Sequence, residues 1–474
     1  VIVHGSRGDF QPFLSLGLEL RSCEFAPSVK FFTDPDHCAT AQQFGFGCCQ
    51  TCAESSKDFL QTRKGLVAMT KGDIQLCWAD DEEHDEDDQR LEKLVQKPEV
   101  DWDRVVHDGL EEFGTSLILY NDLSKHCART YSTEHDVPAI RVLLQPHGIP
   151  SNEIVPMTLQ RRFELDPDWP ILRLWLMVVK WDAEASLLHD TQETPESIYD
   201  MIFGIEDALQ PVLCAFSRVM WPAPADWPQR NVEITGPWKI KQQAQSTCAE
   251  KGVAYFDSGQ RKLCDEFLLG GPPPVYIGWG SMIVHSKEYM SVLAVEALQV
   301  AGQRGIVVAG WADLSTSCLQ GVENAGELLD YCAKHVLFLN AAPHEVLFPR
   351  CACAVHHGGI GTSQASLGVG LPTVITPVFA DQFDIGNYVA RMEVGMCTGH
   401  LAEVSASEVG QAIRACCSEE RFRSNARRLA EQMSKEDGVG RARVVLQQFV
   451  EKQCLTGNWK RRHIELKKSL RNRR

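Results

Sequence analysis

Apolar and polar positions at the start of the chain follow the order strand, loop, helix. The letters VIV predict a strand, HGSRGD predicts a glycine-containing loop, and QPFLSLGLEL (11–20) predicts a helix with Pro12 in its first turn. Leu14 and Leu18 lie four residues apart, as the apolar face of a helix requires. SVKFFT then predicts a second strand, and the alternation indicates a parallel sheet.

The same alternation returns twice further along the chain. SLILYND (116–122) and VPAIRVLL (137–144) predict strands on either side of a helical stretch that ends at Glu134. In the second half, PVYIGWGSM (274–282) predicts a strand running into a glycine turn, and GIVVAG, HVLFLN, CACAVHH and LPTVITP predict further strands. The fold class is therefore α/β, with two parallel-sheet domains and a ligand cleft expected between them at the carboxyl ends of strands.

A polar, irregular segment over 238–272 ends in GGPPP, a composition typical of an interdomain linker. We therefore expect an N-terminal domain over 1–237, a C-terminal domain over 273–445 and a basic tail over 446–474. The length of 474 residues suits two domains of roughly 200 residues each.

Charge excludes one broad class of function. Lys and Arg total 47, Asp and Glu total 63, and the net charge of -16 argues against a general nucleic-acid binder. The acidic run DDEEHDEDD (80–88) predicts a solvated loop. The basic end KRRHIELKKSLRNRR indicates either a frayed charged terminus or a contact with anionic lipid.

Apolar runs are too short to span a bilayer, which takes about 20 residues. The nearest, ILRLWLMVVKW (171–181), carries Arg173 and Lys180 and predicts a buried or interfacial helix, suited either to an apolar ligand or to an ordinary core. We expect a cytoplasmic protein, with peripheral membrane contact as the alternative. Most of the 18 cysteines are expected to remain thiols. Cys49 and Cys52 form one CxxC pair with no second pair, so no zinc site is predicted.

The segment VHHGGIGTSQASLGVGLP (355–372) contains five glycines and two adjacent histidines. It predicts strand, glycine loop and helix, so that backbone N–H groups at the helix N-terminus form an anion site suited to a diphosphate, with His356 as a further donor. The alternative is a tight turn with a core histidine. Gln364 stands where the third glycine of GxGxxG belongs, and no GK[ST] follows, so neither nucleotide-binding fingerprint fits.

Carboxylate and amide side chains occur at two other predicted strand ends. Asp381 and Gln382 suit a clamp for sugar hydroxyls, because a carboxylate accepts hydrogen bonds while an amide both donates and accepts; a surface turn is the alternative. Asp9 lies in the loop after the first predicted strand, either as a catalytic group or as the cap of the following helix. His4 is a rival general base.

Several motifs together resemble the sterol 3-beta-glucosyltransferases and are similar to bacterial enzymes that glycosylate antibiotics. They are HGSRGDFQPFLSLGLEL, APADWPQRNVEITGPW, PPPVYIGWGSM and the long block from HEVLFP to FADQF. They span roughly residues 1–400, whereas 40–115 and 150–205 show little resemblance. The resemblance implies a GT-B fold, with two Rossmann-like domains facing a central cleft, the acceptor on the first domain and the nucleotide sugar on the second.

The resemblance also implies inverting transfer of glucose from UDP-glucose to a sterol hydroxyl, without metal or cofactor. By position it assigns the general base to Asp9, the sugar clamp to Asp381 and Gln382, a phosphate contact to Ser281 and the uridine border to His344. It assigns the diphosphate loop to five residues: His356, Gly358, Gly359, Gly361 and Thr362.

Two other functions stay open. The first is transfer to another lipid or polyketide alcohol, and the second is a non-catalytic lipid-binding module on a glycosyltransferase scaffold. Plant small-molecule glucosyltransferases keep a ribose-binding glutamate at the position of Gln364, although the sterol branch does not hold to it. Acidic triplets such as DWD (101–103) follow no clear strand, so a metal-dependent DxD glycosyltransferase is not predicted.

Overall fold

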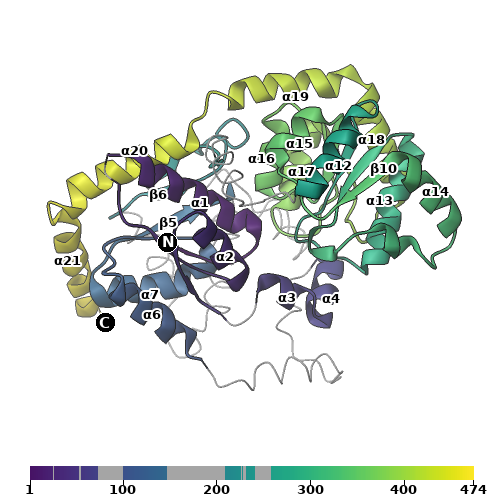
Figure 1. Cartoon of the computed structure of the whole chain (residues 1–474). Helices are drawn as coiled ribbons and strands as arrows, with labels where there is room; N and C mark the ends of the chain where they lie inside the picture. The colour runs from purple at the N-terminus through teal and green to yellow at the C-terminus, as the bar shows by residue number, and fades with distance from the viewer. Residues whose placement is uncertain are drawn as a thin grey trace. The chain divides into compact units, whose positions relative to one another are not determined.

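The computed structural model describes residues 1–24, 26–52, 55–72, 100–146, 209–225, 227, 231–240 and 258–473. The chain divides into two compact units, which are described separately (Figure 1). The first unit comprises Val1–Ala53, Val100–Gln245 and Glu436–Arg474, and the second comprises Glu54–Glu99 and Ser246–Lys435. The acidic run at 80–88 and the apolar stretch at 171–181 lie outside the described residues.

The first unit is built on a parallel sheet of strand order β3-β2-β1-β4-β5-β6-β7. The strands are β1 (Ile2–Val3), β2 (Lys30–Thr33), β3 (Gly47–Gln50), β4 (Ile118–Tyr120), β5 (Ala139–Leu143), β6 (Val212–Cys214) and β7 (Val232–Ile234). Ile2 pairs with Phe32 on one side and with Tyr120 on the other, so the strand order reverses between β1 and β4. The strands predicted from VIV, SVKFFT, SLILYND and VPAIRVLL are confirmed.

Helices flank this sheet. They are α1 (Arg7–Ser22), α2 (Pro35–Gln43), α6 (Trp102–Glu112), α7 (Lys125–His135), α20 (Gly438–Phe449) and α21 (Asn458–Arg473), with a short 3-10 turn η2 (Asp122–Ser124) before α7 and a π-helical turn η9 (Val450–Cys454) before α21. Helix α1 begins four residues earlier than the predicted start at residue 11, because Ser6 and Asp9 form a capping box that satisfies its first N–H groups.

The C-terminal helices belong to the first unit. Helix α20 packs against α1, where Arg443 forms an ion pair of 3.3 Å with Glu19. In α21, Trp459 is 3% exposed and its Nε1 donates to Gln210 Oε1 at 3.0 Å. The basic end of the chain, for which a frayed terminus was one of two alternatives, is therefore a helix anchored to the first unit by a buried aromatic ring, while its contact with anionic lipid stays a prediction.

The second unit is built on a six-stranded sheet of order β10-β9-β8-β11-β12-β13, again with every described neighbouring pair parallel. The strands are β8 (Val275–Ile277), β9 (Gly305–Val308), β10 (Val336–Leu339), β11 (Cys353–His356), β12 (Thr373–Ile375) and β13 (Gly395–Cys397). The strands predicted in the second half are confirmed, since each of the five predicted runs contains one of the strands β8 to β12.

Helices and short 3-10 turns surround the second sheet. They are α3 (Ser56–Leu60), α4 (Arg63–Lys71), α12 (Ser258–Leu269), α13 (Lys287–Ala301), η6 (Gly310–Ala312), η7 (Thr316–Leu319), α14 (Ala325–His335), α15 (His344–Leu347), η8 (Phe348–Arg350), α16 (Ile360–Leu367), α17 (Gln382–Arg391), α18 (Ala406–Ser418) and α19 (Glu420–Met433). Helix α12 therefore lies inside the segment that the composition indicated as a linker.

Helices α3 and α4 pack on the second unit although they precede most of the first sheet in sequence. Leu60 and Met69 belong to the core cluster formed around β8, β11 and α13. The backbone N–H of His285 donates to Thr70 Oγ1 at 2.9 Å. Residues 55–72, expected within the N-terminal domain, thus contribute apolar surface to the C-terminal half of the chain.

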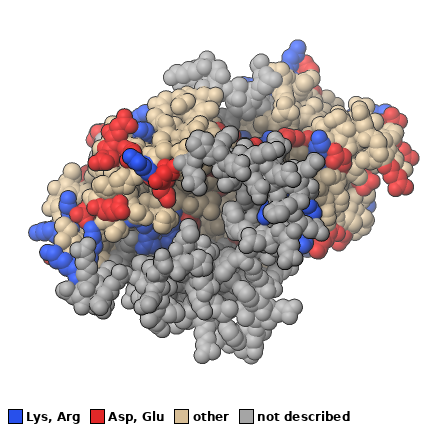
Figure 2. Space-filling model, turned by 90° about the horizontal axis from the view of Figure 1, so that it is seen from below, with Lys and Arg blue, Asp and Glu red and all other residues tan. Residues whose placement is uncertain are grey.

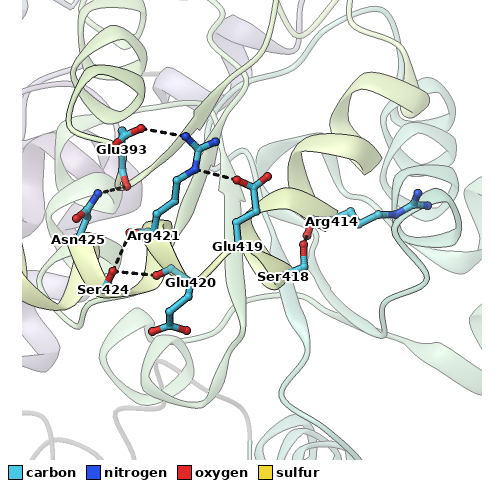
Figure 3. Close-up of polar contacts among 8 residues, drawn as sticks. All are labelled: Glu393, Arg414, Ser418, Glu419, Glu420, Arg421, Ser424 and Asn425. Carbon is cyan, nitrogen blue, oxygen red and sulfur yellow. Dashed lines mark hydrogen bonds and ion pairs between the residues drawn. The ribbon is translucent and has the colours of Figure 1, made fainter.

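A polar cluster at the surface of the second unit joins three of its elements (Figure 3). The guanidinium of Arg421 lies 2.9 Å from Glu393 Oε1 and 2.8 Å from Glu419 Oε2. The amide of Asn425 donates to the Glu393 carbonyl at 3.1 Å. These bonds connect the end of α17 with the junction of α18 and α19, and the exposed charges lie far enough in solvent to contribute little individually.

One pair of cysteines departs from the expectation of free thiols: Cys38 in α2 and Cys48 in β3 are joined as a disulfide. Cys49 and Cys52 are thiols that take part in no disulfide. Cys52 Sγ points at Asp34 Oδ1 at 3.6 Å, and burial together with that carboxylate raises the pKa of the Cys52 thiol to about 12.

Candidate functional site

The strand order of the second unit reverses between β8 and β11, which are neighbours. Ile277 pairs with Val355 near the carboxyl end of both strands. The turn Gly278–Ser281 follows β8, and the loop His357–Gly359 follows β11 before α16 begins. Ligands of open α/β sheets bind where the loops diverge at such a reversal, so the glycine loop stands at the expected place.

Glycine is required in this loop by geometry. Gly358 has φ +94°, and a Cβ at that position would lie 2.8 Å from Ile375 Cγ2 and 3.0 Å from the carbonyl oxygen of Gln382. Gly359 occupies the N-cap of α16, where no described side chain caps the helix. The first N–H groups of α16 therefore have no partner within the helix, and the dipole makes this end favourable for an anion.

Three of the predicted loop residues stand at this helix end. Gly359 is half-buried, Gly361 is exposed, and a Cβ at Gly361 would meet no described atom within 4 Å. Thr362 is half-buried in the first turn of α16. The loop therefore offers backbone donors and one hydroxyl to a group approaching from solvent.

His356, predicted to contact a phosphate, lies fully buried at the end of β11. The side chain is 0% exposed, and its Nδ1 accepts a hydrogen bond from the Gly358 N–H at 3.1 Å. Burial, with a smaller contribution from the His357 and His344 rings, holds the pKa of His356 well below its usual range. A neutral, buried ring that accepts from the loop backbone suits a positioning role, and the predicted phosphate contact of His356 stays a prediction.

His357 is a candidate site residue that the sequence reasoning did not single out. Its Nδ1 is buried and has no hydrogen-bond partner among the described residues. The ring stands between two glycines, since a Cβ at Gly280 would lie 3.2 Å from His357 Cε1 and one at Gly359 would collide with His357 Nε2. Burial lowers the pKa of His357 to about 4, so the imidazole is neutral at pH 7 and can donate from one nitrogen.

Ser281 lies in the turn after β8, and His344 contacts a residue of β8 itself. Ser281 is half-buried and follows Gly280, whose carbonyl accepts from the Trp311 N–H at 2.8 Å. His344 opens α15, and its Nε2 lies 3.1 Å from the Tyr276 hydroxyl. Its ring also stacks on Phe348 at 4.5 Å. Ser281 thus shares a turn with the glycine that contacts His357, whereas His344 is held in an aromatic cluster.

Asp381 and Gln382 begin α17, directly beside the glycine loop. Gln382 is 4% exposed, and its Oε1 accepts from the Val378 N–H at 2.8 Å and the Phe379 N–H at 3.2 Å. The amide oxygen therefore accepts from two backbone N–H groups and stabilises the turn after β12. Asp381 is 8% exposed at the N-cap of α17. Gln382 thus shapes the turn beside the glycine loop, and the sugar clamp of Asp381 and Gln382 stays a prediction.

The first unit has a matching reversal between β1 and β4, and Asp9 lies in the first turn of α1, the helix that follows β1. Its Oδ2 accepts from the Ser6 N–H at 2.8 Å and from the Ser6 hydroxyl at 3.0 Å. Burial outweighs these bonds, and with the nearby Asp34 it raises the pKa of Asp9 to about 6. The capping interpretation is thus confirmed, and the raised pKa also suits a general base, which works best with a pKa near the operating pH.

His4 is fixed by hydrogen bonds at both ring nitrogens. Nδ1 lies 2.9 Å from Ser124 Oγ, and Nε2 lies 2.5 Å from Thr51 Oγ1. Asn121 Nδ2 donates to the His4 carbonyl at 2.8 Å and so joins the ends of β1 and β4. Asp34, at the end of β2, accepts from the Gly5 N–H at 3.1 Å. His4 is therefore a weaker candidate base than Asp9.

Comparisons with known proteins agree with this architecture. The profile of the family "Erythromycin biosynthesis protein CIII-like, C-terminal domain" matches residues 319–439, which include the glycine loop, Asp381 and Gln382. The calicheamicin glycosyltransferase CalG4 superposes with a TM-score of 0.57 over 95% of this chain and 97% of that one, at 12% identity. Os79 from O. sativa, in complex with UDP, gives 0.60 over 94% and 99%, at 18% identity. The chain therefore has the GT-B fold of two Rossmann-like sheets.

Similarity in sequence indicates a narrower group of proteins than similarity in fold does. A sterol 3-beta-glucosyltransferase of Emericella nidulans is 33% identical over 232 residues, which are 49% of this chain and 15% of that protein. One of Arabidopsis thaliana is 40% identical over 177 residues, 37% of this chain and 26% of that protein. The chain thus matches about a quarter or less of the length of these relatives. The matches confirm the resemblance to the sterol 3-beta-glucosyltransferases.

Proposed function

We propose that this protein transfers a glucosyl group from UDP-glucose to the hydroxyl of a sterol, with inversion and without a metal ion. The observation that carries the proposal is the loop after β11. There the uncapped start of α16 and the unpartnered Nδ1 of His357 occupy the strand-order reversal of a GT-B unit. The relatives named as sterol 3-beta-glucosyltransferases support the choice of acceptor.

The donor diphosphate belongs at the N-terminus of α16 in this proposal. Backbone N–H groups of Gly359, Gly361 and Thr362 point toward it, and the neutral ring of His357 adds a donor. During transfer, negative charge grows on the departing UDP, and fixed N–H dipoles stabilise that charge without rearrangement. This charge stabilisation is the role that a metal ion has in metal-dependent glycosyltransferases, and it makes a cation dispensable.

The acceptor hydroxyl loses its proton to Asp9. With a pKa of about 6, the carboxyl is mostly ionised at pH 7 yet basic enough to take the proton as the oxygen attacks. The oxygen forms a bond to the anomeric carbon on the face opposite the diphosphate, and the bond to UDP breaks. The stereochemistry at that carbon is inverted, and the transition state has oxocarbenium character.

Two features bear on location. No helix among the described residues is both long and apolar enough to cross a membrane. Lys and Arg side chains gather at the left edge of Figure 2, on the side where Figure 1 draws α21, and Lys460, Arg461 and Lys468 of that helix are exposed. In this proposal the protein is cytoplasmic and touches anionic membranes with α21, because exposed cationic side chains attract anionic lipid and the acceptor is dissolved in lipid.

The test is mass-spectrometric detection of hexose transfer from UDP-glucose to a panel of sterols and other lipid alcohols, with EDTA present. A steryl hexoside formed in EDTA is the expected result. Transfer only to non-sterol alcohols would move the function to another acceptor class. Binding of UDP without transfer to any alcohol would favour a non-catalytic lipid-binding module and overturn the proposal.

A further inference from the structure

A cluster of potential metal ligands lies in the first unit, away from the loops just described. His107 of α6 and His135 of α7 bring their Nε2 atoms to 2.7 Å from each other. Glu134 Oε2 lies 3.4 Å from His107 Nε2. Among the described residues, this is the only group of three His, Cys, Asp or Glu side chains whose ligand atoms all converge within 4.8 Å.

The helices that carry these side chains are held by a buried core. Val106 and Leu110 of α6 pack in one cluster with Ala128 and Tyr131 of α7. Tyr131 also orients the two rings: it stacks on His135 at 4.2 Å and meets His107 edge-on at 5.2 Å. The imidazoles are therefore fixed on rigid elements before any ligand arrives, which is what a metal site needs.

We propose that His107, Glu134 and His135 form a binding site for a divalent transition-metal ion, with zinc as the best fit, that links α6 to α7. Two imidazole nitrogens and one carboxylate oxygen are the donors that zinc prefers, whereas magnesium and calcium select sites made of oxygen alone. Three protein ligands leave a fourth tetrahedral position for water.

The distances are close to those of a tetrahedral site. Bonds of about 2.0–2.1 Å place two ligand atoms about 3.3 Å apart around tetrahedral zinc. The separation of His107 Nε2 and Glu134 Oε2, 3.4 Å, already matches. The two imidazole nitrogens, at 2.7 Å, share an N–H···N hydrogen bond and need to move apart by roughly 0.6 Å for an ion to replace it.

Neighbouring charge supports an ion at this position. Asp108 Oδ1 lies 4.0 Å from His107 Nδ1, on the opposite side of the ring from the cluster. A second carboxylate near the cluster adds negative charge, which favours a bound cation. Glu134 is 56% exposed, so an ion can enter from solvent and the carboxylate can rotate onto it.

The site has no part in the proposed sugar transfer. Helix α7 begins beside the loop after β4, while Glu134 and His135 lie in its last turn. The helix has 11 residues and is therefore about 16 Å long. An ion between α6 and α7 is thus a structural link, and the prediction of metal-free catalysis is unaffected by it.

The experiment titrates the chelator-treated full chain with Co²⁺, whose visible absorption reports tetrahedral coordination, and then displaces it with Zn²⁺. One equivalent of Co²⁺ is expected to give the band, without the thiolate charge-transfer absorption that a cysteine site produces. The double variant His107→Ala and His135→Ala is expected to lose at least about 100-fold in affinity, since even outer-shell changes cost 10–100-fold.

The matched control is His126→Ala, which removes an exposed histidine from the same helix α7. This variant is expected to bind Co²⁺ as the parent protein does. Zn²⁺ is also expected to raise the Tm of the parent and of the control but not of the double variant, because an ion that binds only the folded state stabilises it. Equal affinity in the parent and the double variant, or no tetrahedral band in the parent, would overturn the proposal.

Discussion

Asp9 is the side chain on which the proposed chemistry depends most at the residue scale. Asp9→Asn keeps the size of the group and its ability to accept from Ser6, but removes the base. We expect kcat to fall by about 10²-fold or more, with the Kd for UDP unchanged. Steady-state kinetics and calorimetry measure the two quantities, and Asp36→Asn, an exposed carboxylate in α2, is the control. Near-normal turnover in Asp9→Asn would remove this residue from its role.

The raised pKa of Asp9 also predicts a pH profile. The base works only when ionised, so kcat/KM is expected to rise with pH and to level off above about pH 6. Folding stability depends on pH in the opposite direction. A carboxyl whose pKa is higher in the folded state than in the unfolded state stabilises the fold when it is protonated. This contribution is therefore lost as the pH rises from the ordinary value of 3.8 through about 6. Asp9→Asn should flatten both dependences.

Substitutions of the two adjacent histidines are predicted to have different effects. His357→Ala removes the side chain with the unpartnered nitrogen, so we expect the Kd for UDP to rise about tenfold while the Tm changes little. His356→Ala removes the acceptor of the buried Gly358 N–H, at a cost of about 1–3 kcal/mol, so the Tm should fall. Calorimetry with UDP and thermal melts separate the two. The reverse pattern would restore His356 as the phosphate contact.

At the scale of elements, α18 offers a clean test of local stability. Ser405 caps this helix in a box with Glu408, whose Oε2 accepts from the Ser405 hydroxyl at 2.7 Å. Ser405→Ala is expected to destabilise the second unit by about 1 kcal/mol and to lower its Tm. Ser407→Ala, an exposed position in the first turn of the same helix, is the control and should leave the Tm nearly unchanged.

At the scale of the whole molecule, α21 connects the end of the chain to the first unit. Trp459 stacks on His463 at 4.6 Å and is the buried anchor of the helix. Trp459→Ala is expected to cost about 3–5 kcal/mol in the docking of α21, as removal of a large buried ring does. Hydrogen exchange over 458–473 should then accelerate strongly. The exposed Lys460→Ala is the control, and unchanged protection in Trp459→Ala would show that other contacts hold the helix.

The sequence by itself determined the alternation of strands and helices and the glycine loop, whereas the GT-B class came from the resemblance to the sterol 3-beta-glucosyltransferases. The alternation and the loop follow from local patterns: apolar runs of strand length, four-residue spacing of leucines, and a position such as Gly358 where the backbone excludes a side chain. The residue types of the predicted anion site also follow from the local sequence, because backbone N–H groups at a helix N-terminus need no distant partner.

Only the tertiary structure decided that the His356 ring is fully buried and accepts from the Gly358 N–H, while His357 Nδ1 has no partner among the described residues. It also placed 55–72 with the second unit and α20 and α21 with the first, since apolar anchors such as Met69 and Trp459 find their partners far along the chain. The pKa of Asp9 and the meeting of His107 with His135 depend on burial and on packing between separate elements. No local pattern encodes those quantities.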